Sequence, residues 1–457
     1  MDTSTAPSSN LPIELLQLIF RYCAEFEDLR VGLFRTYPAW IVVTHVCSRW
    51  RGAALNYSLL WTLINTDKLG KRWIKAFMER SKASLIDVSL RINPDSGKTR
   101  HLLNVDEVIA LFAECTRLRS LHVSGRIDIV HKLLDTLHIA THIRFLHLHV
   151  ANQSTPVELP NNLLGGQAPI REMCFASVSF IIAPHWLLRG ITHFTSNQRI
   201  PLQILLDTLC QMPVLLSFTL ERCVLDWKGT DAPRDVQIPM QNLMYLKVDV
   251  DAGSPVIFAL LHRRLALPNR AKKILRFHRS SDSYSSMHWS HSILAIPPSL
   301  RDVIDSTDGS HHVQFSGGIT VGNFRLWTGD AGHEEAEFLF ELSWEFRVRK
   351  FPIFDLPSLC DLLGVKRVRT FRIPVVSLGP NGFNQLWELL KRLSAVEEME
   401  LCADAVRGFC SARGARRQET VLPELRSVHM VKTEPTSNVA EMTEEELLRV
   451  FRGNPKH

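Results

Sequence analysis

The sequence predicts a mixed α/β chain in which a small three-helix module is followed by an irregular solenoid of short strands and helices. Three short apolar segments at helical spacing occupy the first 64 residues. From about residue 96 onward, a leucine-headed strand pattern recurs at intervals of roughly 20 to 30 residues. With 457 residues, the chain exceeds the size of one compact core, which favours two or three domains or one long stack of repeats.

Composition and charge exclude several classes of protein. Hydrophobic residues at 45% and charged residues at 22% are typical of a folded chain with a real core. The net charge of +6, from 53 basic and 47 acidic residues, is too weak for a dedicated nucleic-acid binder. We expect residues 1–9 to be a disordered tail, and the absence of a long apolar run predicts no membrane partner and a cytoplasmic or nuclear location. The nine cysteines are scattered without a C-x-x-C pair, which predicts reduced thiols.

The first helix is predicted to begin near residue 11. Asn10 is a capping type of residue, Pro12 suits the first turn of a helix, and Glu14 places an acid at the positive end of the helix dipole. The apolar residues that follow recur at helical spacing along one face: Leu11, Leu15, Leu16, Ile19, Phe20 and Cys23.

Two further apolar segments complete a module over residues 10–64. A second helix is predicted over residues 40–54, and the residues that share one of its sides are Val43, Val46, Cys47, Trp50 and Ala54. A turn at residues 56–58 precedes a third cluster, which contains Leu59, Leu60, Trp61, Leu63 and Ile64. Three short helices bury too little surface to be robust, so we expect this module to need a partner.

These residues resemble a known family. The pattern L-P-x-E-L-L-x-x-I-F from Leu11, V-C-x-x-W-R from Val46 and L-W at Leu60 resembles the F-box. Residues 43–55 are similar to the F-box-like proteins expanded in mushroom-forming fungi. The chain departs from the family in its longer segment at residues 21–39 and in a turn without proline at residues 56–58.

The resemblance implies docking onto the Skp-type adaptor of a cullin-containing SCF (Skp, cullin, F-box) ubiquitin ligase. The positions that it implies face the adaptor or hold the shape of the module are Leu11, Pro12, Leu15, Ile19, Val46, Cys47 and Trp50. Leu16, Phe20 and Trp61 are expected in the core of the module. The alternative is that all these residues are internal core; exposed apolar patches on so small a module favour contact for Leu11, Pro12 and Leu15.

A joint is predicted over residues 65–95. Residues 71–80 form a basic helix with Trp73, Phe77 and Met78 on one face, and residues 85–90 have the alternation of a strand. We expect Trp73 and Phe77 to pack in the core and the helix and strand to make a rigid connection.

The repeat domain is predicted over residues 96–430. Its strand patterns lie at residues 118–123, 143–150, 170–175, 215–220, 243–248, 368–373, 396–401 and 425–430. Helices are predicted between them at residues 105–115, 129–137, 202–209, 256–265 and 383–393. The spacing L-x-x-L-x-L is typical of leucine-rich repeats, in which leucines face inward and the intervening residues face a concave surface.

Two features of the repeat domain are irregular, and the tail that follows it is predicted to have a helix of its own. The usual asparagine or cysteine ladder is mostly missing, although Cys174 and Cys223 are candidates for such inward places. Residues 288–337 contain several glycine and proline turns and predict an irregular insertion. In the tail at residues 431–457, Thr443 and Glu446 form a capping box that opens a helix, expected to cover the last repeat.

No pattern of a catalytic site is present. The sequence lacks the glycine-rich phosphate loops, the nucleophile elbow and the H-E-x-x-H zinc motif, so we predict no catalytic residue, metal or cofactor. The densest histidine group comprises His138, His142, His147 and His149. We interpret these histidines as polar residues on an exposed repeat face, although His147 and His149 would share one face of a strand.

Basic residues suggest where a protein substrate could bind. If the strands carry Arg276, Arg369 and Arg372 onto the concave face, these residues could pair with an acidic or phosphorylated segment. Solvated surface charge is the alternative. The basic stretches that contain these arginines lack the interleaved aromatic residues expected of a nucleic-acid site.

The sequence as a whole predicts a substrate-recognition adaptor of an SCF-type ubiquitin ligase, which binds the adaptor through the F-box-like module and an unknown protein substrate through the repeats. One alternative is a protein-interaction scaffold that keeps the F-box fold without a ligase. The other is an enzyme or nucleic-acid binder hidden in residues 288–372.

Overall fold

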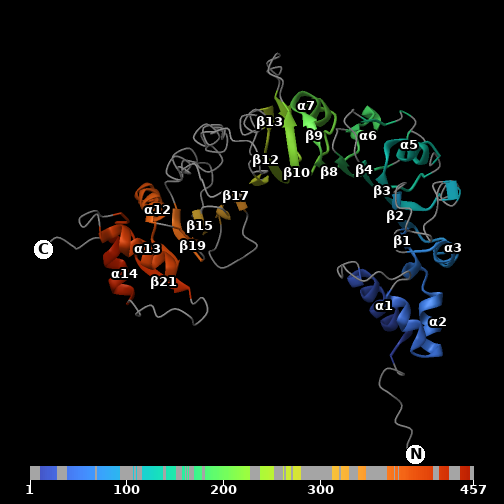
Figure 1. Ribbon diagram of the computed structural model, residues 1–457, viewed down its shortest axis with the longest axis horizontal. Coiled ribbons are helices and arrows are strands. Elements are labelled where there is room, and N and C mark those ends of the chain that lie inside the picture. The colour runs from blue at the N-terminus through green and yellow to red at the C-terminus, as the bar shows by residue number, and fades with distance from the viewer. Residues whose placement is uncertain are drawn as a thin grey trace, which may run out of the picture. The chain divides into compact units, whose positions relative to one another are not determined.

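The computed structural model describes the secondary structure of a large part of the chain (Figure 1). The described residues are 11–27, 39–66, 69–92, 106–107, 110, 116–136, 140–150, 157–159, 161, 163, 169–177, 181–226, 237–251, 261, 264–268, 271–278, 311–318, 321–328, 338–345, 368–374, 376–378, 380–414, 421–431 and 443–452. The predicted tail at residues 1–9 lies outside them.

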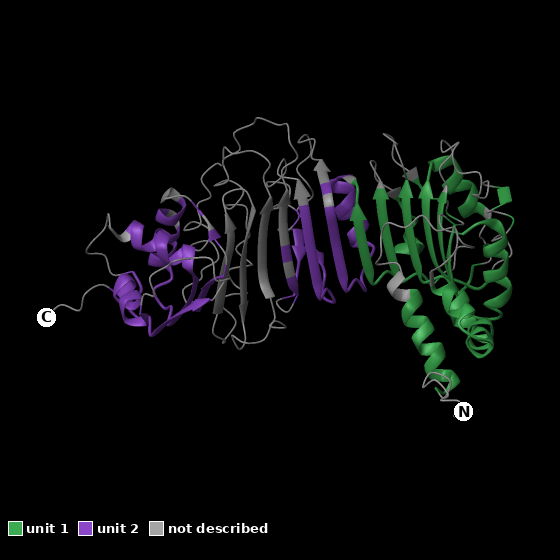
Figure 2. Cartoon of the chain, turned by 60° about the horizontal axis from the view of Figure 1, so that its bottom comes forward, with its two compact units in different colours: residues 1–198 green, residues 199–457 purple. Residues whose placement is uncertain are grey.

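The chain divides into two compact units, residues 1–198 and residues 199–457 (Figure 2). The first unit contains the N-terminal helices and the first set of repeats. The second contains the remaining repeats and the C-terminal helix.

Within its described residues, the N-terminal helical segment contains four helical elements, where three helices were predicted. They are α1 (Ile13–Glu27), the 3-10 helix η2 (Ala39–His45), α2 (Ser48–Asn56) and the 3-10 helix η3 (Ser58–Trp61). The single helix predicted over residues 40–54 is therefore wrong. Cys47 interrupts it with an extended backbone, and its side chain accepts a hydrogen bond from the backbone N–H of Trp50 as an N-cap.

An aromatic cluster forms the inner core of this segment and joins it to the next helix, α3 (Lys71–Arg80). The ring of Trp61 lies 5.0 Å from that of Trp40 and 5.1 Å from that of Phe77, in edge-to-face arrangements. The range predicted for α3 is confirmed, but its buried face carries Ile74 and Phe77. Trp73, which was also expected to pack in the core, is half-buried.

The sheet of the first unit begins directly after the helical segment. Its strands are β1 (Leu63–Asn65), β2 (Ile86–Ile92), β3 (Leu118–Gly125), β4 (Phe145–Val150), β6 (Glu172–Ser177) and β8 (His193–Asn197). Each strand pairs in parallel with the next one in the sequence. Parallel pairing requires a crossover between strands. Helix α5 (Ile127–Thr136) lies between β3 and β4, and helix α6 (His185–Leu188) lies between β6 and β8. Strands β5 (Val157–Glu158) and β7 (Ile181–Ile182), which precede and follow β6 in the sequence, form a short parallel pair.

The second unit repeats this arrangement. Strands β9 (Arg199–Pro201), β10 (Ser217–Asp226), β12 (Tyr245–Asp251) and β14 (Lys272–His278) pair in parallel, with α7 (Leu202–Cys210) between the first two. A short parallel pair joins β11 (Ile238–Pro239) to β13 (Leu265–Ala266). The predicted helix at residues 256–265 therefore ends before Leu265, which is in β13. Most of that helix and of the one predicted at residues 105–115 lies outside the described residues.

Three strands interrupt the parallel order of the second unit. They are β15 (His311–Gly318), β16 (Val321–Thr328) and β17 (Phe338–Glu345), which pair with one another in antiparallel fashion. Strand β17 pairs with β14, and β15 pairs with β18 (Val368–Ile373), both in parallel. The three strands therefore lie in reverse sequence order within the sheet. Two of them fall in the stretch expected to be irregular, residues 288–337.

The C-terminal repeats end in packed helices. Strands β18, β20 (Glu398–Cys402) and β21 (Ser427–Val431) are parallel, and the short strand β19 (Val376–Ser377) pairs with β15. Helix α12 (Pro380–Arg392) precedes β20, and helix α13 (Ala403–Gly414) lies between β20 and β21. The last helix, α14 (Glu444–Arg452), begins with the predicted capping box: the Glu446 N–H donates to Thr443 Oγ1, and the Thr443 N–H donates to Glu446 Oε2. Phe451 of α14 packs 5.3 Å from Phe409 of α13, so this helix covers the last described repeats.

The leucine-headed patterns agree with the structure. Each of the eight patterns overlaps a strand, and the pattern at residues 368–373 coincides with β18. The period of the apolar residues is responsible, because alternate residues of each strand are buried, as in Leu146, Leu148 and Val150 of β4. Strands β8 and β14 to β17 were not predicted, nor were the short strands of two or three residues.

Candidate interaction surfaces

Helix α1 carries a stripe of exposed apolar side chains. Leu15 is 46% exposed, and the residues three, four and seven positions later are exposed to similar extents: Leu18 (45%), Ile19 (41%) and Tyr22 (53%). This spacing places the four side chains on one face of the helix. We refer to these four residues as the α1 stripe. Contiguous exposed apolar surface of this kind is typical of an interaction site.

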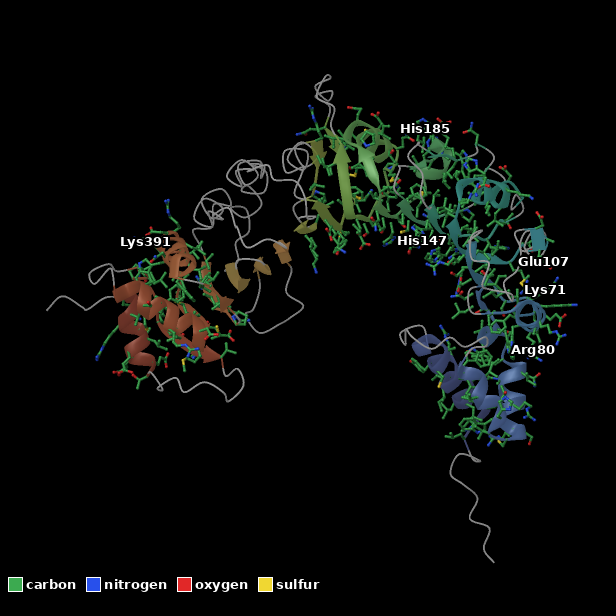
Figure 3. All side chains as sticks on the ribbon, viewed as in Figure 1. Lys71, Arg80, Glu107, His147, His185 and Lys391 are labelled. Carbon is green, nitrogen blue, oxygen red and sulfur yellow. The ribbon has the colours of Figure 1, made fainter. Side chains whose placement is uncertain are left out.

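The inner side of the same helical segment is closely packed. Leu16, Phe20 and Trp61 are all buried. Trp61 Nε1 donates to the backbone oxygen of Ala54 at 2.9 Å, and the guanidinium of Arg80 lies 4.4 Å from the centre of its ring (Figure 3 labels Arg80). These contacts join η3 to α2 and α3.

The residues implied to face the adaptor lie on the outer side of this segment to different extents. Leu15 and Ile19 belong to the α1 stripe, and Pro12 precedes it and is exposed. Val46, 60% exposed, and the exposed Cys47 lie where the predicted second helix is interrupted.

The remaining two of these residues are half-buried. The carbonyl of Leu11 accepts a hydrogen bond from the guanidinium of Arg49. Trp50 packs 5.3 Å from the buried ring of Phe20. Leu11 is therefore held by a hydrogen bond of its backbone and Trp50 by ring packing, while both keep a half-exposed surface.

Histidines from neighbouring strands gather on the polar face of the first sheet (Figure 3 labels His147). The rings of His122 and His147 are stacked, with 4.0 Å between centres, and Ser124 Oγ lies 2.9 Å from His149 Nδ1. Burial, followed by the charges of His122 and His149, lowers the pKa of His147 to about 4. Burial is also the main cause that lowers the pKa of His122. Both imidazoles are therefore neutral near pH 7.

The histidine group is not assembled as a metal site in the described part of the chain. No cluster of three or more His, Cys, Asp or Glu side chains suited to a metal is found among the described residues. His142 is exposed, and His138 lies outside the described residues. Cys174 lies opposite His147 in the pairing of β4 with β6 and is half-exposed, so the inward position expected for it is wrong. Cys223 is buried, as expected.

The arginines predicted to face a substrate have carboxylates beside them. Arg369 Nε lies 3.7 Å from Glu397 Oε1, and Arg372 Nε lies 3.0 Å from Glu400 Oε2 on the neighbouring strand. An acidic ligand would have to compete with these carboxylates. The backbone of Arg276 lies in β14 opposite Asp249, and its side chain lies outside the described residues.

Sequence reasoning missed a second group of arginines, in the first unit. Arg144 and Arg171 are exposed, and neither forms an ion pair within the part of the chain that the structure describes. Arg119 occupies the equivalent place one strand earlier, where its guanidinium pairs with Asp87. The signal was present in the sequence, because arginine directly follows the first apolar residue of three successive patterns, L-R-S-L, I-R-F-L and I-R-E-M.

Comparisons with known proteins assign no family. No protein-family model and no curated protein sequence matches the chain. Among solved structures, the leucine-rich repeat-containing protein LegL7 from Legionella pneumophila is 12% identical; the match covers 81% of this chain and 92% of that chain, with a TM-score of 0.24. Within the described residues, no helix combines the length and apolar character needed to cross a membrane. The strand pairing within each unit shows a mixed α/β chain built from strand-and-helix repeats on parallel sheets.

Proposed function

We propose that this chain is a recruitment protein. Its N-terminal helical segment docks onto the Skp-type adaptor of an SCF ubiquitin ligase, and its repeat sheets hold a protein substrate. The chain supplies no catalytic group, and the cullin-bound partners perform the chemistry. The compartment in which this takes place is the cytoplasm or the nucleus.

The observation that carries this proposal is the α1 stripe. Complete burial of a leucine side chain contributes roughly 1.5–3 kcal/mol. The four stripe residues already hide about half of their surface, so covering them would contribute on the order of 3–6 kcal/mol. Association itself costs about 4–15 kcal/mol. The stripe alone is therefore too small, and docking requires further contacts such as those expected of Pro12 and Val46.

The coupling of this segment to the first sheet supports a tethering mechanism. Strand β1 follows η3 directly and pairs in parallel with β2, with Leu63 opposite Asp87. The aromatic contacts of Trp61 with Phe77 tie the segment to α3. A partner held on α1 and a substrate held on the first sheet would thus be connected through packed side chains, which raises their effective concentration.

Capture by a purified Skp-type adaptor tests the proposal. The variant combines Leu15→Asp and Ile19→Asp, whose exposed side chains tolerate a charge without loss of the core. The matched control is Met244→Asp in the second unit, because Met244 is 47% exposed and so resembles Leu15 in exposure. We expect the wild type and the control to be captured and the double variant to bind at least about tenfold more weakly.

Circular dichroism of all three proteins checks that folding is retained. Failure of the folded wild type to bind the adaptor would refute the ligase role. The protein would then be an interaction scaffold that uses the α1 stripe for another partner. Equal capture of all three proteins would show that the adaptor binds elsewhere on the chain.

A further inference from the structure

One backbone position recurs at the start of several described repeat strands. Its carbonyl accepts the N–H groups of two successive residues on the next strand: the Arg144 carbonyl accepts from Arg171 at 2.8 Å and from Glu172 at 3.0 Å. The Arg171 carbonyl accepts in the same way from Thr192 at 2.8 Å and His193 at 3.1 Å. We call this the rim position, because it stacks one residue per strand along the edge where the strands begin.

The rim position of the first unit holds Arg119, Arg144 and Arg171 on three neighbouring strands. Adjacent strands lie about 4.8 Å apart, so these residues form a column with that spacing. Asp87 pairs with Arg119, and its Oδ1 lies 2.9 Å from the arginine Nε. Arg144 and Arg171 are exposed without a carboxylate partner among the described residues. We call these two residues the arginine pair.

The second unit shows what the same position looks like when its charge is satisfied. Its last three rim residues are Arg369, Glu397 and Arg426, which alternate in sign. Glu397 lies 3.7 Å from the first arginine and 3.3 Å from the second. Like charges on adjacent strands are unfavourable and opposite charges are favourable. The arginine pair lacks the intervening acid, so an anion supplied from outside would take its place.

We propose that the arginine pair binds an acidic segment of a protein partner, with one carboxylate for each guanidinium. This inference deepens the proposed recruitment function and rests on it for the partner being a protein. Arginine presents a planar fork that matches a carboxylate with two parallel hydrogen bonds. The two arginines lie on adjacent strands, about 4.8 Å apart at the backbone, and the Debye length at physiological salt is about 8 Å, so their charges attract an acidic segment together.

The surroundings of the pair favour a short acidic segment over a nucleic acid. Asp87 pairs with Arg119 at one end of the column. Glu172, which follows Arg171 in β6, has its carboxylate turned toward His193, with 3.9 Å between Oε1 and Nδ1. A continuous phosphate backbone would bring negative charge against these two acids. A peptide with two or three acids can place its carboxylates on the arginine pair and neutral residues beside the acids.

Binding of a fluorescent peptide of alternating glutamate and serine to the full chain tests the inference. The variant is Arg144→Gln with Arg171→Gln, and the matched control is Arg369→Gln with Arg426→Gln, at the same backbone position where the charge is already paired. We expect the first variant to weaken peptide binding roughly tenfold and the control to leave it almost unchanged. A glutamine-serine peptide should not bind.

Three outcomes would overturn the inference: unchanged binding in the first variant, equal loss in both variants, or tighter binding of a thymidine oligonucleotide that the first variant abolishes. The last outcome would make the pair a nucleic-acid contact. Adaptor capture is measured on the same proteins to separate the two proposals. Peptide binding without adaptor capture refutes the ligase role alone, and adaptor capture without peptide binding refutes the arginine pair alone.

Discussion

Replacement of Trp61 by phenylalanine tests how far the N-terminal segment depends on one buried hydrogen bond. Trp61 is 1% exposed, and its Nε1 donates to the backbone oxygen of Ala54 at 2.9 Å. Trp186 offers a matched control in the same unit. Its Nε1 donates to the backbone oxygen of Asn161 at the same distance, 2.9 Å, but the ring is only half-buried and the bond is exposed.

The expected magnitudes follow from what replaces the lost donor. In Trp61→Phe, the carbonyl of Ala54 keeps only a long bond, 3.4 Å, from the N–H of Tyr57, and no water can reach the buried site freely. Loss of a buried partner costs about 1–3 kcal/mol, and the remaining bond places this case near 1–2 kcal/mol. The smaller ring adds up to about 1 kcal/mol through lost packing. In Trp186→Phe, water replaces the donor, so we expect less than about 0.5 kcal/mol.

Urea denaturation followed by far-ultraviolet circular dichroism measures the change in the free energy of unfolding. Amide hydrogen exchange of residues 48–61 reports on the segment itself, because a chain with two compact units need not unfold in one step. If the two variants lose the same free energy within about 0.5 kcal/mol, the reasoning from burial is wrong. Unaltered exchange of residues 48–61 in Trp61→Phe would have the same meaning.

Two other predictions concern packing and pH. In α13, Gly408→Ala would drive a methyl group into the ring of Phe383 and should destabilise the protein by about 1–3 kcal/mol. In α2, the methyl group of Gly52→Ala meets no atom within 4 Å, so this variant should be neutral or stabilising. Thermal unfolding distinguishes the two variants, and equal shifts of their unfolding temperatures would contradict the packing argument. Burial lowers the pKa of His147 to about 4, below its ordinary value of 6.5, so the unfolded chain binds a proton in this range that the folded chain does not. The free energy of unfolding should therefore fall as the pH drops from 6.5 toward 4. The fall should be less steep in His147→Gln, in which the stacked partner His122 remains. Denaturation midpoints measured against pH test this, and identical slopes of midpoint against pH in the two proteins would refute it.

The prediction of strands depended on short-range information. A strand that buries alternate residues shows its inward face in the sequence itself, as Leu121 and Val123 of β3 do. The capping box at Thr443 was equally local, because both partners lie within four residues of each other. The same alternation directs Cys174 outward, between the buried Met173 and Phe175, so its expected inward position went against the local pattern.

The assignment of surface charge shows the limit of such local patterns. Arg369 and Arg372 attracted attention because they lie in a basic stretch of the sequence. In the structure their neighbours are Glu397 and Glu400, which follow 28 residues later and reach them only through the pairing of β18 with β20. The arginine pair was overlooked because Arg144 and Arg171 are far apart in the sequence and neither belongs to a basic run.

The sequence by itself determined the mixed α/β class, the positions of eight repeat strands and the helix at residues 71–80, because the period of apolar residues is a property of adjacent positions. Only the tertiary structure decided that β15 to β17 lie in reverse order and which charges are neutralised. These features depend on which strands become neighbours and which side chains meet across them. Such contacts join residues that are separated by whole repeats, and their free energies are not encoded in any single pattern along the chain.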